Sequence, residues 1–88
     1  MIEEIYKSLL KTSDFVREKS QQRIPKEVIE LIFEQPYCKT EFIINKEIAQ
    51  RKAAERYLKE LVRLKILEPE KVGKEVVYKN NELYRILT

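Results

Sequence analysis

The side chains whose type most clearly suggests a binding role are four basic residues in the second half of the chain, Arg51, Lys52, Lys71 and Lys74. Guanidinium and ammonium groups bind phosphates, and an arginine can also pair with guanine through two hydrogen bonds. Residues 46–79 hold ten basic and six acidic side chains, so the excess behind the net charge of +3 lies there. The four residues are therefore candidate contacts to nucleic acid.

Several features oppose that interpretation. Glu55 places a negative charge on the helix face that would approach phosphates, and the pairs Arg51–Glu55–Lys59 and Arg56–Glu60 are spaced to neutralise one another on an exposed helix. The basic excess is also small for the phosphate attraction that dominates affinity for nucleic acid. We therefore rank DNA below another protein as the expected partner.

Catalytic chemistry is poorly represented in the composition. The absence of histidine removes the usual general base, Cys/His zinc sites and the Ser-His-Asp relay. The single cysteine, Cys38, has no basic partner evident in the sequence, and we expect it to be a buried small residue in a protein of the reducing cytoplasm. We expect no catalytic, cofactor-binding or metal-binding residue in this chain.

Hydropathy spacing predicts the elements that position these side chains. Apolar residues at intervals of three and four predict an amphipathic helix over residues 2–19. Further helices are expected from Pro25 to about residue 35, from Thr40, whose hydroxyl would be the N-cap, and over residues 49–64. Strands over 66–72 and 75–78 flank Gly73, which suits a hairpin turn, and Asn80 or Asn81 can cap a last helix.

This order of elements predicts a mainly α, α+β fold of the winged helix-turn-helix type. A three-helix core would carry a β-hairpin wing, with an extra amphipathic helix before it and a short helix after it. We divide the chain into a linker helix, residues 1–22, and a winged-helix domain, residues 23–88. The longest apolar runs are three residues, so we expect neither a membrane span nor a membrane partner.

The apolar stripe of the first helix is a candidate surface for self-association or domain docking. A domain that already buries its own core is expected to leave part of such a stripe unsatisfied, and exposed apolar stripes are usually interaction surfaces. The helix could fold back on the winged helix or pair with a second copy, and we expect a homodimer. The stripe consists of Ile2, Ile5, Tyr6, Leu9 and Val16.

Three segments between residues 24 and 88 resemble one known pattern in the same order. Residues 31–38, LIFEQPYC, are similar to an LLF-x-QPYC motif, and residues 48–51 and 56–61, IAQR and RYLKEL, are similar to the helix that follows it. Residues 71–75, KVGKE, with Tyr78 and Asn80, resemble its wing and the start of its final helix. The pattern is that of the C-terminal winged helix-turn-helix domain of bacterial Fic-family proteins.

The resemblance implies a function through the proteins that carry such domains. Fic proteins typically transfer AMP from ATP to a hydroxyl side chain of a target protein, with a motif of the form HPFx[DE]GNGR that this chain lacks. It implies a non-catalytic module of a protein AMP-transferase, with ATP bound only in a catalytic domain outside this chain. Contacts with that catalytic domain or another protein would give it a regulatory or interaction role. An autonomous DNA-binding regulator is the alternative.

Overall fold

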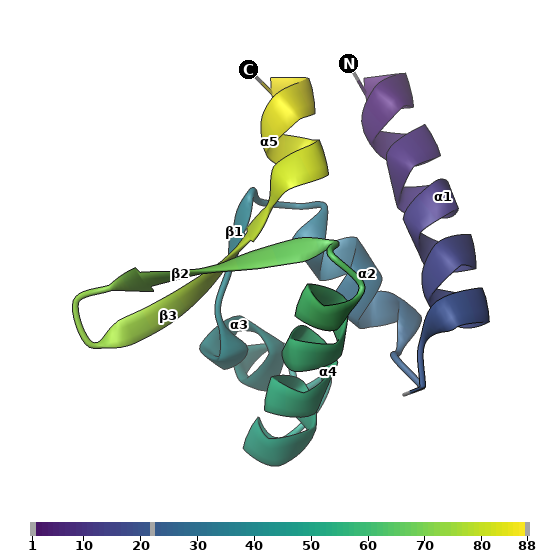
Figure 1. Cartoon of the computed structure of the whole chain (residues 1–88). Coiled ribbons are helices and arrows are strands. Elements are labelled where there is room, and N and C mark those ends of the chain that lie inside the picture. Colours follow the sequence, from purple (N-terminus) through teal and green to yellow (C-terminus); the bar gives the residue numbers. More distant parts are fainter. Residues whose placement is uncertain (1, 22, 88) are drawn as a thin grey trace.

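The computed structural model describes residues 2–21 and 23–87, except for the side chain of Ile2, which lies outside the described part of the chain. Three short strands form one sheet, and helices surround it on several sides (Figure 1). The elements follow in the order α1 (Ile2–Lys19), α2 (Lys26–Ile32), β1 (Tyr37–Cys38), α3 (Thr40–Asn45), α4 (Arg51–Arg63), β2 (Leu67–Val72), β3 (Glu75–Asn80) and α5 (Asn81–Leu87).

Helix α1 has the span that its apolar spacing predicts. Glu3 and Glu4 lie in its first turn and Arg17 and Lys19 in its last, which are the charge signs that the helix dipole favours at each end. The helix packs against α2 and α5, and Figure 1 shows the N-terminal end of α1 beside the C-terminal end of α5. The amphipathic helix ahead of the core is therefore confirmed, and it is joined to the rest of the fold.

A single core lies between the helices and the sheet. Helix α3 packs on α4, and α4 packs on β2, so the apolar stripe of each helix is covered by a neighbour. Most core positions are aliphatic, and the free Cys38 is buried among them, as expected. The side chains with the least exposure in this core are Val28, Ile32, Ile43, Ala54, Leu58, Leu61 and Leu83.

The sheet is antiparallel, with the strand order β1-β3-β2. Strands β2 and β3 form the predicted hairpin, with Val72 opposite Glu75 and Leu67 opposite Asn80. Gly73 has a φ of 63° at the first of the two turn residues, where tight hairpins require positive φ. The α+β winged-helix-like arrangement of helices α2, α3 and α4 with a hairpin wing is therefore confirmed.

Asn80 connects three elements at the base of the wing. Its side-chain amide donates to the Ile32 carbonyl at the end of α2 (2.9 Å), and its Oδ1 accepts from the Leu83 N–H in the first turn of α5 (3.2 Å). Its own N–H donates to the Pro36 carbonyl (2.8 Å). With 1% of its surface exposed, this amide satisfies groups that would otherwise be buried without partners. The prediction of an asparagine cap on the last helix is confirmed, and Asn80 is that cap.

Three helix starts differ from the predictions. Pro25 has an extended conformation (φ −61°, ψ 147°) and precedes α2 as its N-cap instead of occupying its first turn. Lys39 is the N-cap of α3, and its side chain makes no capping hydrogen bond, so the predicted Thr40 cap is wrong. Helix α4 starts at Arg51 because Gln50 is extended, with a ψ of 170°.

Helices α3 and α4 both end in a Schellman motif without glycine. At the end of α3, the Ile48 N–H donates to the Ile43 carbonyl (3.1 Å) and Glu47 has a φ of 57°. At the end of α4, the Ile66 N–H donates to the Leu61 carbonyl (2.9 Å) and Lys65 has a φ of 65°. Glycine is the usual residue at this position because a Cβ is disfavoured at positive φ. Both turns therefore hold backbone strain.

We expect Glu47→Gly and Lys65→Gly each to raise the free energy of unfolding by about 1 kcal/mol, because each removes a Cβ from a left-handed residue. Both side chains are exposed, so little packing is lost. Urea denaturation followed by circular dichroism measures the change. Gly73→Ala is the control of opposite sign, since its new Cβ meets no atom within 4 Å and only the φ of 63° opposes it. Lower stability in both glycine variants would contradict this account.

Candidate interaction surfaces

The start of helix α4 faces the wing across a groove of about 390 Å³. Arg51, Glu55 and Lys59 line it from successive turns of α4, as their spacing of four requires. Lys74 and Tyr78 line it from the wing. The remaining lining residues come from the loop before α3, from α3 and from β3, and they are Lys39, Thr40, Glu41, Glu75 and Val76.

The charges along this groove nearly balance. Four basic side chains line it together with the carboxylates of Glu41, Glu55 and Glu75. The ammonium of Lys39 pairs with Glu75 at 2.7 Å, and this hydrogen bond raises the lysine pKa. A groove of both signs favours a partner that also carries both signs over a uniformly negative phosphate backbone.

An aromatic residue lies among these charges. Tyr78 of β3 is half-buried, and its pKa is raised, first by burial and then by the nearby Glu55 carboxylate. Its phenol therefore stays neutral and can donate a hydrogen bond. Tyrosine is enriched in protein interfaces, so Tyr78 is a candidate contact within this groove.

The structure brings together two of the four predicted phosphate contacts. Arg51 and Lys74 line the same groove from opposite sides, whereas Lys52 and Lys71 lie outside its lining. All four side chains are exposed. Lys71 stands opposite Val76 in the hairpin register. Their role as contacts to DNA stays a prediction.

The predicted docking stripe of helix α1 is largely used within the chain. Val16 is 4% exposed and belongs to the core, and Ile5 and Leu9 pack against that core. Helix α1 therefore packs back on the winged helix, where it contacts α2 and α5. Val16 is therefore buried within the chain, and docking of another domain or copy on this stripe stays a prediction. Among the described side chains of the stripe, Tyr6 is the one that is clearly exposed, at 62%.

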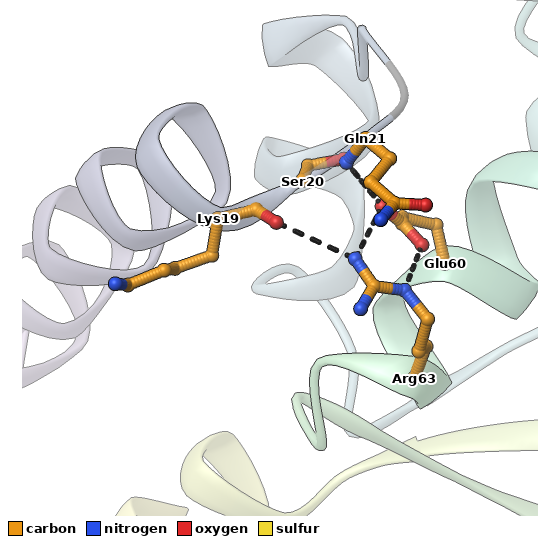
Figure 2. A network of polar contacts seen from close by, with 5 residues as sticks. All are labelled: Lys19, Ser20, Gln21, Glu60 and Arg63. Carbon is orange, nitrogen blue, oxygen red and sulfur yellow. Dashed lines mark hydrogen bonds and ion pairs between the residues drawn. The ribbon is translucent and has the colours of Figure 1, made fainter.

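Sequence reasoning missed a polar network that joins the end of α1 to α4 (Figure 2). The Glu60 carboxylate accepts from the Ser20 hydroxyl (2.9 Å), from the Gln21 N–H (2.6 Å) and from Arg63 Nε (2.6 Å). Arg63 Nη2 donates to Glu60 Oε2 (3.0 Å), the oxygen that also accepts from Ser20 and Gln21, and to the Lys19 carbonyl (3.4 Å). We call this set of five residues the Glu60 clamp.

The Glu60 clamp also corrects an expected ion pair. Glu60 is 7% exposed, so it is not part of a solvated Arg56–Glu60 pair. Its charged form is stabilised chiefly by the hydrogen bond from Arg63, opposed by desolvation and supported by the bonds from Gln21 and Ser20, and its pKa falls to about 2. The sequence signal was a glutamate three residues before an arginine, which is indistinguishable from an exposed helical pair.

In the part of the chain that the structure describes, little supports metal binding, membrane insertion or thiol chemistry. There, no three acidic, cysteine or histidine side chains come together as metal ligands would, and no described helix combines the length and hydropathy needed to cross a bilayer. Burial raises the pKa of the Cys38 thiol to about 11, more than a backbone hydrogen bond with Lys39 lowers it. Such a thiol is a poor nucleophile at neutral pH.

We expect Glu60→Gln to loosen helix α1 and to lower the melting temperature at pH 7, because a neutral amide replaces a carboxylate with four donors. The Gln21 amide should then exchange its hydrogen about tenfold faster or more. The control is Glu34→Gln, which removes an exposed carboxylate whose ion pair with Lys46, at 3.1 Å, involves no residue of α1. Equal losses in the two variants would contradict a structural role for the Glu60 clamp.

Acid should act on the same group. A lowered folded-state pKa means that Glu60 contributes stability fully above its ordinary pKa of 4.5, and that this contribution is lost as the pH falls toward about 2. We therefore expect the stability difference between the protein and Glu60→Gln to shrink over that range. Thermal unfolding at pH 7, 4.5 and about 2.5 measures it, and a difference that stays constant would contradict the assignment.

The family of this chain follows from a comparison with protein-family patterns. Residues 9–83 match the family described as the C-terminal domain of SoFic-like protein adenylyltransferases. The match begins within α1 and ends within α5, so it spans the wing, the Glu60 clamp, the groove between α4 and the wing, and most of the core. This chain belongs to the SoFic-like C-terminal domain family of protein adenylyltransferases.

Proposed function

We propose that this chain is a non-catalytic winged-helix module of a protein adenylyltransferase, with a regulatory or interaction role carried out through protein contacts. Catalysis and ATP binding would belong to a Fic catalytic domain outside these residues. The partner that we propose is that catalytic domain or another protein. Membership of the SoFic-like C-terminal domain family supports the first part.

The observation that carries the proposal is the mixed charge of the groove between α4 and the wing. Arg51 and Lys74 line it together with Glu41, Glu55 and the half-buried Tyr78. A protein surface that offers carboxylates to the basic residues and cations to the glutamates would satisfy all of these groups. A phosphate backbone would satisfy only the basic residues and would be repelled by the glutamates.

The Glu60 clamp supports a positioning role. Helix α1 is held to α4 by the hydrogen bonds to Glu60 and to the core by Val16. A protein segment joined to α1 would therefore have its direction fixed relative to the groove, whereas a flexible linker would transmit no such orientation.

A DNA-binding regulator remains the second candidate because Arg51 and Lys74 lie on one groove at the exposed start of α4. In a DNA-binding winged helix, that part of the helix enters the major groove, and the wing contacts phosphates. Lys52 and Lys71, exposed beside the same elements, would then add further phosphate contacts.

Paired charge reversals separate the two functions. We expect Arg51→Glu to weaken binding of a SoFic-like Fic catalytic domain by roughly tenfold, because Arg51 lines the groove, while Lys52→Glu changes it little. Lys52 is the matched control, since it is the next residue of α4, carries the same charge and lies outside the groove. Isothermal titration calorimetry measures the affinities. Equal effects of the two reversals would contradict groove-mediated protein contact.

A salt series with a duplex of about 20 base pairs tests the alternative. Under our proposal, the chain binds this DNA weakly or not at all at about 50 mM salt, and Glu55→Lys increases the affinity by removing the repulsive carboxylate. Fluorescence anisotropy measures both. Tight binding that weakens steeply with salt, and equally on reversal of Arg51, Lys52 or Lys71, would replace our proposal with the DNA-binding function.

A further inference from the structure

Helix α1 carries a second stripe beside the one that packs into the core. Starting from Glu3, the stripe advances by three, four, three and four residues, which is the spacing of a seam between paired helices. Its two large apolar members, Tyr6 and Leu10, are 62% and 46% exposed. We call this stripe the α1 seam, and it consists of Glu3, Tyr6, Leu10, Ser13 and Arg17.

The α1 seam borders a groove of about 690 Å³ between α1 and the start of α2. Leu10, Ser13 and Arg17 line this groove from α1, and Ile24 and Ile29 line it from the other side. The seam and the groove together leave one long side of α1 open to a partner helix, in addition to the side that the core covers.

The opposite flank of α1 is already occupied. The pKa of Glu82 in α5 is lowered first by its hydrogen bond from Arg85 and to a lesser extent by one from Ser8 of α1. The pKa of Arg85 is raised first by Glu82 and to a lesser extent by the Glu4 carboxylate of α1. Glu4 and Ser8 therefore face α5, whereas Glu3 and Leu10 lie on the open side of the helix.

The charges of the α1 seam select the orientation of a second helix. The seam begins with a carboxylate, Glu3, and ends with a guanidinium, Arg17. An antiparallel copy centred on Leu10 places Leu10 on Leu10 and each Glu3 opposite the Arg17 of the other copy. A parallel copy would place Glu3 on Glu3 and Arg17 on Arg17. Among residues 2–21 and 23–87, Arg17 has a loose ion pair with Asp14 of its own helix, at 3.9 Å and with both side chains exposed, so its guanidinium can turn to a partner.

We propose that the chain forms a two-fold symmetric homodimer in which the α1 seams of two copies pack antiparallel. Leu10 lies at the centre, each Tyr6 lies over the Ser13 and Asp14 turn of the other copy, and two Glu3–Arg17 pairs close the ends. This surface lies on α1 and borders α2, apart from the groove between α4 and the wing, so the proposal does not depend on the function proposed above.

Such an interface is self-complementary, as a two-fold axis requires. Because it rests on about four turns of one helix, its area is at the small end for specific contacts, and the dimer should exchange with monomer at micromolar or higher concentrations. The side chain that anchors it, Leu10, contributes to no part of the core cluster. Changes at Leu10 should therefore affect association more than folding.

Sedimentation equilibrium of the 88-residue chain over a range of concentrations tests the proposal. We expect a monomer–dimer equilibrium that Leu10→Glu abolishes, while Val72→Glu, at a wing residue of 57% exposure, leaves it unchanged. Glu3→Arg alone and Arg17→Glu alone should each weaken the dimer by roughly tenfold, because each turns two attractive pairs into repulsive ones. The double variant Glu3→Arg with Arg17→Glu should restore it.

Three results would overturn the proposal. A chain that stays monomeric at millimolar concentration does not pair through α1. A dimer that survives Leu10→Glu uses another surface. A dimer that both single reversals weaken, but that the double reversal fails to restore, does not have the antiparallel register. The rescue also separates association from folding, since an unfolded α1 would not recover on addition of a second reversal.

Discussion

The buried carboxylate of Glu60 is the constraint on which the arrangement of the helices depends. A charge that is 7% exposed must be surrounded by donors, and these come from Arg63 on the same helix and from Ser20 and Gln21 just after α1. These hydrogen bonds fix the position of the C-terminal end of α1 relative to α4. They therefore decide which side of α1 reaches the core and which side stays open.

The two candidate surfaces differ in the way they use charge. The groove between α4 and the wing is lined by four basic and three acidic side chains, so its contacts depend on the complementary placement of charge on a partner. The α1 seam separates its signs along one helix, which makes orientation the property that charge selects. Neither surface has the uniform positive field that a phosphate-binding protein needs, although the chain carries a net charge of +3.

Local patterns predicted most of the fold because each one depends on near neighbours. Apolar spacing placed α1 and α4, Gly73 placed the hairpin turn, and Asn80 was one of two expected caps. Glu60 could not be predicted, because its partners at Ser20 and Gln21 are about forty residues away and an i,i+3 glutamate and arginine are usually exposed. For the same reason, the sequence indicated Arg51 and Lys74 as candidate contacts but not that they line one groove. The spacing of Val16 likewise could not distinguish a docking stripe from a core stripe.

The Glu60 clamp fixes the orientation of the two surfaces relative to each other. In Figure 1, α1 and the wing lie at opposite sides of the fold, with α4 between them. If α1 pairs with a second copy, the clamp holds each α4 to its own α1, so the two grooves point in directions related by the two-fold axis. Two fixed grooves raise the effective concentration of a partner that has two matching sites, whereas grooves on mobile arms would gain less. The buried carboxylate would then shape how the module engages its partner, although it lies on neither surface.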